Sequence, residues 1–211
     1  MTDLLAALLL GIIEGITEFL PISSTGHLLI AERWLGHRSD LFNVAIQAGA
    51  ILAVVAIYRQ RLWHLVVGFR QRATSDSALV PGGDSFDYTL KLAVAFGVTA
   101  VGGLLVKKLG WELPDEVRPI AWALIVGGIW MLLAEHFAAK RAAALGERTS
   151  ISWTVAILVG IAQVVAGVFP GTSRSGATIF VALLAGTTSR VAATEFAFLV
   201  GIPTMFAATA Y

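Results

Sequence analysis

The stretch Glu14–His27 reads EGITEFLPISSTGH, and a related stretch, Gln163–Gly176, reads QVVAGVFPGTSRSG. In each, an apolar segment ends at a proline that is followed by hydroxyl side chains. Charged side chains are costly in hydrocarbon, at roughly 2.5–3.5 kcal/mol for Asp, Lys or Arg at the centre of a membrane helix. A chain that gathers carboxylates, hydroxyls, an imidazole and a guanidinium around two matching turns is therefore expected to carry out chemistry or transport there.

Composition places these turns in a polytopic membrane protein. Of the 211 residues, 57% are hydrophobic and only 14% are charged, whereas a soluble domain has about 25% charged residues. The formal net charge of +1 argues against nucleic acid as a partner. The lack of cysteine excludes disulfides, thiol catalysis and thiolate metal sites. No cleavable signal peptide is expected, because the first residues lack a basic region.

Apolar runs predict the helices. Four runs approach the ~20 residues that span a bilayer, namely 42–58, 88–106, 119–134 (extending to about 139) and 191–211. Two further segments, 4–22 and 151–170, end in the proline turns and lead into the shorter apolar stretches 26–35 and 176–186. We interpret each of these as a re-entrant helical hairpin whose broken tip lies at membrane depth. One kinked spanning helix at each position is the alternative.

Loop charge predicts the orientation. The loops 59–87 and 140–150 are rich in Arg and Lys, which places them in the cytoplasm by the positive-inside rule. Alternation then places the loop 107–118 outside. Three spans separate the two hairpins, so if the first enters from outside, the second enters from the cytoplasm.

The two turns also predict an internal repeat. Aligning Pro21 with Pro170 superposes Gly11 on Gly160, Glu14 on Gln163, Ser23 on Thr172 and Ser24 on Ser173. The predicted fold is therefore all-α, a single integral membrane domain over 1–211 with an inverted-topology repeat, two hairpins and about four spanning helices. The first repeat covers about 1–139 and the second about 150–211. Symmetry predicts two more spans, six in all, in a complete repeat pair.

The acids of the first turn suit a divalent cation. Glu14 and Glu18 are four residues apart and share one face of a helix. Two carboxylates there repel each other unless a cation or a proton lies between them, so we predict that they bind Mg²⁺ or Ca²⁺. A base paired with a protonated acid is the alternative.

The residues after each proline suit an anion. Helix N-termini bind phosphate through free backbone N–H groups, and the forked guanidinium of Arg174 matches phosphate oxygens. His27 lies one turn into its helix, close to the same hydroxyls. We predict a diphosphate site with the substrate-binding residues Ser23, Thr25, Gly171, Thr172, Ser173 and Ser175. Each feature also has an ordinary role, because such hydroxyls cap helices, a histidine can bridge helices and Glu18 can pair with Arg174.

At these residues the sequence resembles the bacterial undecaprenyl-diphosphatase family, also called the bacitracin-resistance protein family. The resemblance covers the whole chain and rests on Glu14–His27, on Pro170–Gly176 (PGTSRSG) and on Phe42–Gly49 (FNVAIQAG). It implies a multi-pass enzyme of the bacterial inner membrane that converts undecaprenyl diphosphate to undecaprenyl phosphate and inorganic phosphate, at a site facing the periplasm. This reaction recycles the lipid carrier for peptidoglycan and other envelope polymers and confers bacitracin resistance. Family members extend further at the C-terminus, in agreement with the two spans that symmetry predicts.

For this reaction we assign catalytic roles to Glu18, Ser24, His27 and Arg174. Ser24 is the leading nucleophile, deprotonated by Glu18 or His27, and direct attack by water with Glu18 as base is the rival. Arg174 neutralises charge on the transferring phosphoryl group. A transporter or flippase for a phosphorylated lipid or phosphate is the alternative function, because inverted repeats with broken helices also build transporters. The sequence leaves open the metal, the prenyl chain length and whether the protein forms a homodimer.

Overall fold

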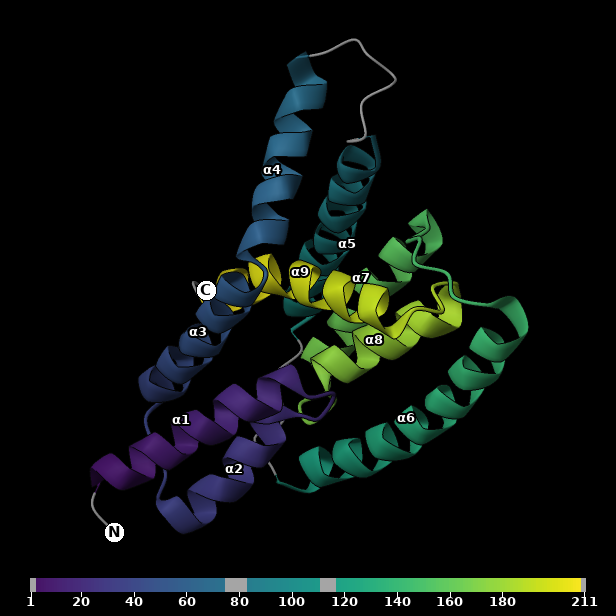
Figure 1. Cartoon of the computed structure of the whole chain (residues 1–211). Coiled ribbons are helices and arrows are strands. Elements are labelled where there is room, and N and C mark those ends of the chain that lie inside the picture. Colours follow the sequence, from purple (N-terminus) through teal and green to yellow (C-terminus); the bar gives the residue numbers. More distant parts are fainter. Residues whose placement is uncertain (1–2, 75–82, 111–116, 210–211) are drawn as a thin grey trace.

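The computed structural model describes residues 3–74, 83–110 and 117–209, and over these ranges the chain forms helices and no strand. The helices are α1 (Asp3–Phe19), α2 (Ser24–Leu35), α3 (Asp40–Ile57), α4 (Arg59–Thr74), α5 (Gly83–Lys108), α6 (Val117–Leu145), α7 (Trp153–Val168), α8 (Arg174–Ala185) and α9 (Arg190–Thr209). Figure 1 shows them as two helical hairpins, α1–α2 and α7–α8, with the other helices around them. The chain is thus an all-α, multi-pass membrane protein, as predicted.

Both proline turns break their helices. Proline lacks the N–H that an α-helix needs and disfavours the helical conformation of the residue before it. In the first turn, α1 ends at Phe19, α2 begins at Ser24, and the Ser23 hydroxyl accepts a hydrogen bond from the Gly26 N–H at 3.2 Å. The second turn repeats this cap between Ser173 and Gly176 at 3.0 Å.

Each pair of helices folds back on itself, because α1 packs against α2 and α7 against α8. At 17 and 16 residues, α1 and α7 are shorter than the ~20 residues that a span needs. These two observations support hairpins over single kinked spanning helices.

The spanning helices agree only partly with the prediction. By length and composition α5, α6 and α9 can each cross a membrane, while α3 and α4 qualify only together, as a pair bent by 65°. The predicted loop 59–87 is wrong in its first part, where α4 is helical through Thr74. This segment has apolar residues at helical spacing, Leu65 is buried, and α4 packs against α5. Helices α5 and α6 also run past their predicted ends at 106 and 139, while residues 75–82 and 111–116 lie outside the described residues.

Small residues bring α5 and α7 into close contact. A Cβ added at Gly160 would lie 2.6 Å from the Ala95 carbonyl oxygen, and one added at Gly102 would lie 2.5 Å from a methyl of Val164. Glycine at such points lets membrane helices approach closely. The Thr99 hydroxyl also donates to the Gly160 carbonyl at 3.2 Å. This contact fixes α7, and through it the second tip.

Around this contact lies the main core of the described structure. It is built from α7, α8 and α9, with Val155, Val159, Phe196 and Val200 fully buried. In the same region an Arg61–Glu195 ion pair of 2.8 Å joins α4 to α9. Helix α5 packs against α7 and helix α9 against α8. This packing fixes the second hairpin and with it the residues at its tip.

We predict that Gly160→Val destabilises the protein by about 1–3 kcal/mol, because the added methyls collide with backbone and force α5 away from α7. Thermal unfolding of the detergent-solubilised protein measures this as a lower midpoint. Gly167→Val on the same helix is the matched control, since a Cβ there meets nothing within 4 Å. Equal midpoints for the two variants would show that the contact is not tight.

Candidate active site

The tips of the two hairpins touch (Figure 1). The Ser175 hydroxyl of the second tip donates to the Leu20 carbonyl of the first at 2.8 Å. A Cβ added at Gly176 would lie 3.1 Å from the Pro21 carbonyl oxygen, so the two backbones approach each other closely there. The predicted convergence of the two turns is confirmed.

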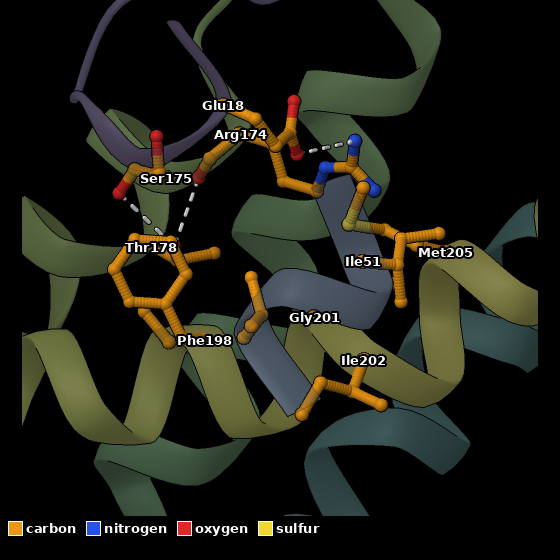
Figure 2. Close-up of a pocket in the computed structure, with 11 residues that line it drawn as sticks. Glu18, Ile51, Arg174, Ser175, Thr178, Phe198, Gly201, Ile202 and Met205 are labelled. Atoms are coloured by element: carbon orange, nitrogen blue, oxygen red, sulfur yellow. Dashed lines mark hydrogen bonds and ion pairs between the residues drawn. The ribbon is translucent and has the colours of Figure 1, made fainter. Parts of the chain in front are cut away.

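Glu18 lies at the centre of the contact. Its Oε2 accepts a hydrogen bond from the Ser24 hydroxyl at 2.6 Å, and its Oε1 lies 3.3 Å from Nη2 of Arg174. The Glu18 side chain is only 10% exposed and that of Arg174 27%, so the pair is shielded from solvent. Figure 2 shows the guanidinium turned toward the carboxylate. One carboxylate thereby joins a hydroxyl of the first hairpin to the cation of the second.

The geometry distinguishes the two predicted bases. A general base must lie within about 2.6–3.2 Å of the group whose proton it takes, and Glu18 meets this condition for Ser24. His27 instead directs Nδ1 to the Ser23 carbonyl at 2.7 Å. Because a carbonyl accepts, Nδ1 carries the proton, and the ring can act only through Nε2. In the described structure Glu18 is therefore the one of the two that hydrogen-bonds to Ser24, while His27 contacts the Ser23 carbonyl.

Four of the predicted substrate-binding hydroxyls differ in their surroundings. Ser23 and Ser173 are buried helix caps, so their ordinary structural role is realised. Ser175 lines the pocket beside Arg174. Thr25 is exposed in the first turn of α2.

The other two predicted residues shape the second tip. Gly171 has φ +97°, a conformation that favours glycine, and a Cβ there would lie 2.7 Å from the Ile120 carbonyl oxygen of α6. The Thr172 N–H donates to the Phe169 carbonyl at 3.0 Å. Both residues thus define the backbone of the turn that precedes Arg174, against which α6 packs.

Glu14 is buried one turn before Glu18. It is 3% exposed, and its Oε2 has no hydrogen-bond partner among the described residues. A buried carboxylate oxygen without a partner is costly, which indicates that a ligand or water completes it. Its repeat counterpart Gln163 is equally buried, and neither polar atom of its amide has a partner in the described ranges. Within those ranges no cluster of three or more His, Cys, Asp or Glu could hold a metal.

A small pocket opens beside the ion pair (Figure 2). Its cavity volume is about 20 Å³, enough for one water molecule. Its polar side consists of Glu18, Arg174, Ser175 and Thr178, and its apolar side comes from α3 and α9. The apolar residues are Ile51, Val54, Ala197, Phe198, Gly201, Ile202 and Met205.

Sequence reasoning missed Thr178 and the apolar wall. The Thr178 hydroxyl is buried and donates to the Arg174 carbonyl at 2.8 Å. Its position four residues after Arg174 puts both on one helix face, a signal that could have identified it. No comparable signal exists for Phe198, because only the packing of α9 brings it to the site.

Known proteins resemble this chain over nearly its whole length. A family model described as bacitracin resistance protein BacA matches residues 7–211. An undecaprenyl-diphosphatase of Xanthomonas euvesicatoria pv. vesicatoria is 62% identical over 211 residues, which cover 100% of this chain and 74% of that protein. One of Rhizobium etli is 66% identical over 209 residues, which cover 99% of this chain and 73% of that protein.

Proposed function

We propose that this chain, which belongs to the bacitracin resistance protein BacA family, hydrolyses undecaprenyl diphosphate to undecaprenyl phosphate and inorganic phosphate. The relatives named above are undecaprenyl-diphosphatases. The observation that carries the proposal is the contact of Glu18 with both Ser24 and Arg174 across the two tips. It brings together a base, a hydroxyl and a phosphate-binding cation. The product is the lipid carrier on which peptidoglycan is built, so its recycling also explains bacitracin resistance.

Substrate entry requires the tips to rearrange. A cavity of about 20 Å³ is far too small for a diphosphate, and Arg174 is occupied by Glu18. The diphosphate therefore replaces Glu18 as the partner of Arg174. The Arg174 guanidinium then donates charge-assisted hydrogen bonds to phosphate oxygens. The apolar wall from α3 and α9 excludes bulk water, and electrostatic interactions are stronger in such a site.

In the leading mechanism the Ser24 oxygen attacks the terminal phosphorus while its proton passes to Oε2 of Glu18. The bond from that phosphorus to the bridging oxygen breaks, and undecaprenyl phosphate leaves. Water then hydrolyses the phosphoserine, which releases inorganic phosphate and restores Ser24. Arg174 and the backbone N–H groups that begin α2 and α8 stabilise the charge on the phosphoryl oxygens.

The remaining acid near the tips, Glu14, suits a divalent cation. Glu14 has a buried oxygen without a partner in the described structure, and Glu18 lies four residues away. Mg²⁺ is commonly held by one or two carboxylates together with substrate phosphate oxygens and water. We therefore propose that Glu14 and Glu18 hold Mg²⁺, in preference to Ca²⁺, when substrate is bound. The ion would supply positive charge against the diphosphate oxygens.

We place the protein in the bacterial inner membrane with its site open to the periplasm. The base of the second hairpin lies near Arg141, Arg148 and Arg190, where Arg141 donates to the Leu184 carbonyl at 2.6 Å and Arg190 pairs with Glu135. By the positive-inside rule this end faces the cytoplasm. The tip lies at the other end of α7 and α8, deeper in the membrane.

Arg174→Ala is expected to lower phosphate release from undecaprenyl diphosphate by about a thousandfold, since it removes the cation that stabilises the phosphoryl group. The assay uses the purified protein in detergent. Arg190→Ala is the matched control, because it breaks another Arg–Glu pair between helices away from the tips. Equal losses in both variants would contradict a catalytic role for Arg174. No release by the unaltered protein would favour transport over hydrolysis.

Ser24→Ala separates the two mechanisms. Loss of a nucleophile should lower the rate by about ten-thousandfold or more, whereas loss of one hydrogen bond to a charged group should cost only about tenfold to a hundredfold. Acid quenching with substrate labelled in its terminal phosphate should trap label on Ser24. A small rate loss without trapped label would assign the attack to water.

Glu14→Gln is expected to raise the Mg²⁺ concentration for half-maximal activity by about tenfold or more, because a charged ligand is lost. Titration of activity with Mg²⁺ after chelation measures the shift. Saturating Mg²⁺ should restore part of the rate. An unchanged Mg²⁺ requirement would exclude Glu14 as a ligand.

A further inference from the structure

Three aromatic rings connect the end of α1 to α9. The Phe198 ring of α9 lies 5.8 Å from the Phe19 ring and 6.3 Å from the Tyr58 ring, measured between ring centroids. Both pairs are tilted, with interplanar angles of 46° and 34°, and both lie within the range of about 4.5–7 Å that favourable aromatic pairs occupy. We call Phe19, Tyr58 and Phe198 the aromatic cluster. It joins helices that are far apart in the sequence.

The aromatic cluster reaches the candidate active site from two directions. Phe19 directly follows Glu18 and is the last residue of α1. Phe198 lines the pocket beside the Glu18–Arg174 ion pair (Figure 2). The contact between the two rings therefore restrains the helix end that carries the Glu18 carboxylate.

The end of α1 is the part of this helix that most needs such a support. Helix α1 packs lengthwise against α2 and α3. Its buried residues all precede the last two positions: Ala6, Leu10, Glu14 and Thr17. Helix ends fray because their last carbonyl groups have no partner within the helix. Glu18 and Phe19 thus lie where the helix itself restrains the chain least.

Phe198, in contrast, stands on a well-anchored part of α9. Its second ring partner, Tyr58, lies at the 65° bend between α3 and α4. Glu195 is three residues earlier and shares the same face of α9. It pairs with Arg61 of α4 at 2.8 Å and accepts a hydrogen bond from the Tyr88 hydroxyl of α5 at 3.3 Å. This face of α9 is therefore fixed to three other helices.

We propose that Phe198 is a positioning residue that acts through Phe19 on Glu18. It keeps the Glu18 carboxylate within reach of the Ser24 hydroxyl. This inference rests on the proposed function, in which the diphosphate replaces Glu18 at Arg174. Glu18 then loses its ion pair, and the ring contact remains to hold it in place. A misplacement of about 1 Å can cost about a hundredfold in rate, so a small shift of the α1 end is enough to slow the reaction.

Leucine substitutions remove the ring contact but keep an apolar side chain at the pocket wall. Phe198→Leu is expected to lower kcat for undecaprenyl diphosphate by about tenfold, because the base is misplaced, with little change in KM. Phe19→Leu should do the same, although Phe19 does not line the pocket. Phe206→Leu, also on α9 but 42% exposed, is the matched control and should keep the full kcat. A higher KM with unchanged kcat in Phe198→Leu would overturn the proposal.

The double variant tests whether the two rings act together. If Phe198 acts through Phe19, removing both rings should lower kcat by about tenfold, no more than removing one, because residues in contact are not additive. Independent effects would instead multiply to about a hundredfold, which would contradict the proposal. All rates are compared below the thermal unfolding midpoint of each variant, so that loss of the fold does not count as a loss of kcat.

Cross-linking gives a readout that does not depend on catalysis. The chain has no cysteine, so Leu20→Cys and Ser175→Cys can be introduced together at the two tips, where the Ser175 hydroxyl meets the Leu20 carbonyl at 2.8 Å. A short bis-maleimide should join them more slowly when Phe198→Leu is added, and at the unchanged rate when Phe206→Leu is added.

Equal cross-linking rates in these two variants would overturn the proposed hold on the first tip, even if hydrolysis stands. No hydrolysis of undecaprenyl diphosphate by the unaltered protein would instead refute the proposed function. The cross-linking rates would still decide whether Phe198 holds the end of α1.

Discussion

The rest of the site depends on one interaction, the contact of the Glu18 carboxylate with both Ser24 and Arg174. A charge in the interior of a membrane protein is tolerated when it is paired and hydrogen-bonded, and Glu18 has both a cation and a hydroxyl at its two oxygens. Its partners come from different hairpins, 156 residues apart in the case of Arg174. The same contacts that make the acid acceptable also hold the two tips together.

The hairpin tips can meet only because the surrounding helices pack closely. Gly160 lets α5 approach α7, and Gly176 lets the backbone of the second tip approach Pro21. Helix α6 then lies across both turns, against Gly26 and Gly171. Broken backbone at membrane depth is tolerated where protein buries it, so this cover is a condition for the site.

The arrangement divides the demands of a lipid diphosphate between two kinds of surface. Charged and hydroxyl groups gather at the tips, where a helix N-terminus, Arg174 and Glu18 can act on phosphate. Apolar surface lies beside them, in the pocket wall from α3 and α9. The buried, unpaired oxygen of Glu14 is the one charged group near the tips that the described residues leave incomplete, and a substrate-bound cation would complete it.

The sequence by itself determined the class of protein, the two helix breaks and the identity of the groups at the tips. These features follow from local physics, since proline ends a helix, a following serine caps the next one, and composition reports the membrane. The sequence did not indicate that the basic segment Arg59–Thr74 forms a helix with Leu65 buried, and the inverted repeat stays a prediction. Only the tertiary structure decided that Ser24 contacts Glu18 while His27 turns to the Ser23 carbonyl, and that Phe198 lines the site. The first two contacts depend on how the chain bends at the first turn, and Phe198 reaches the site through the packing of a distant helix. The local sequence encodes neither.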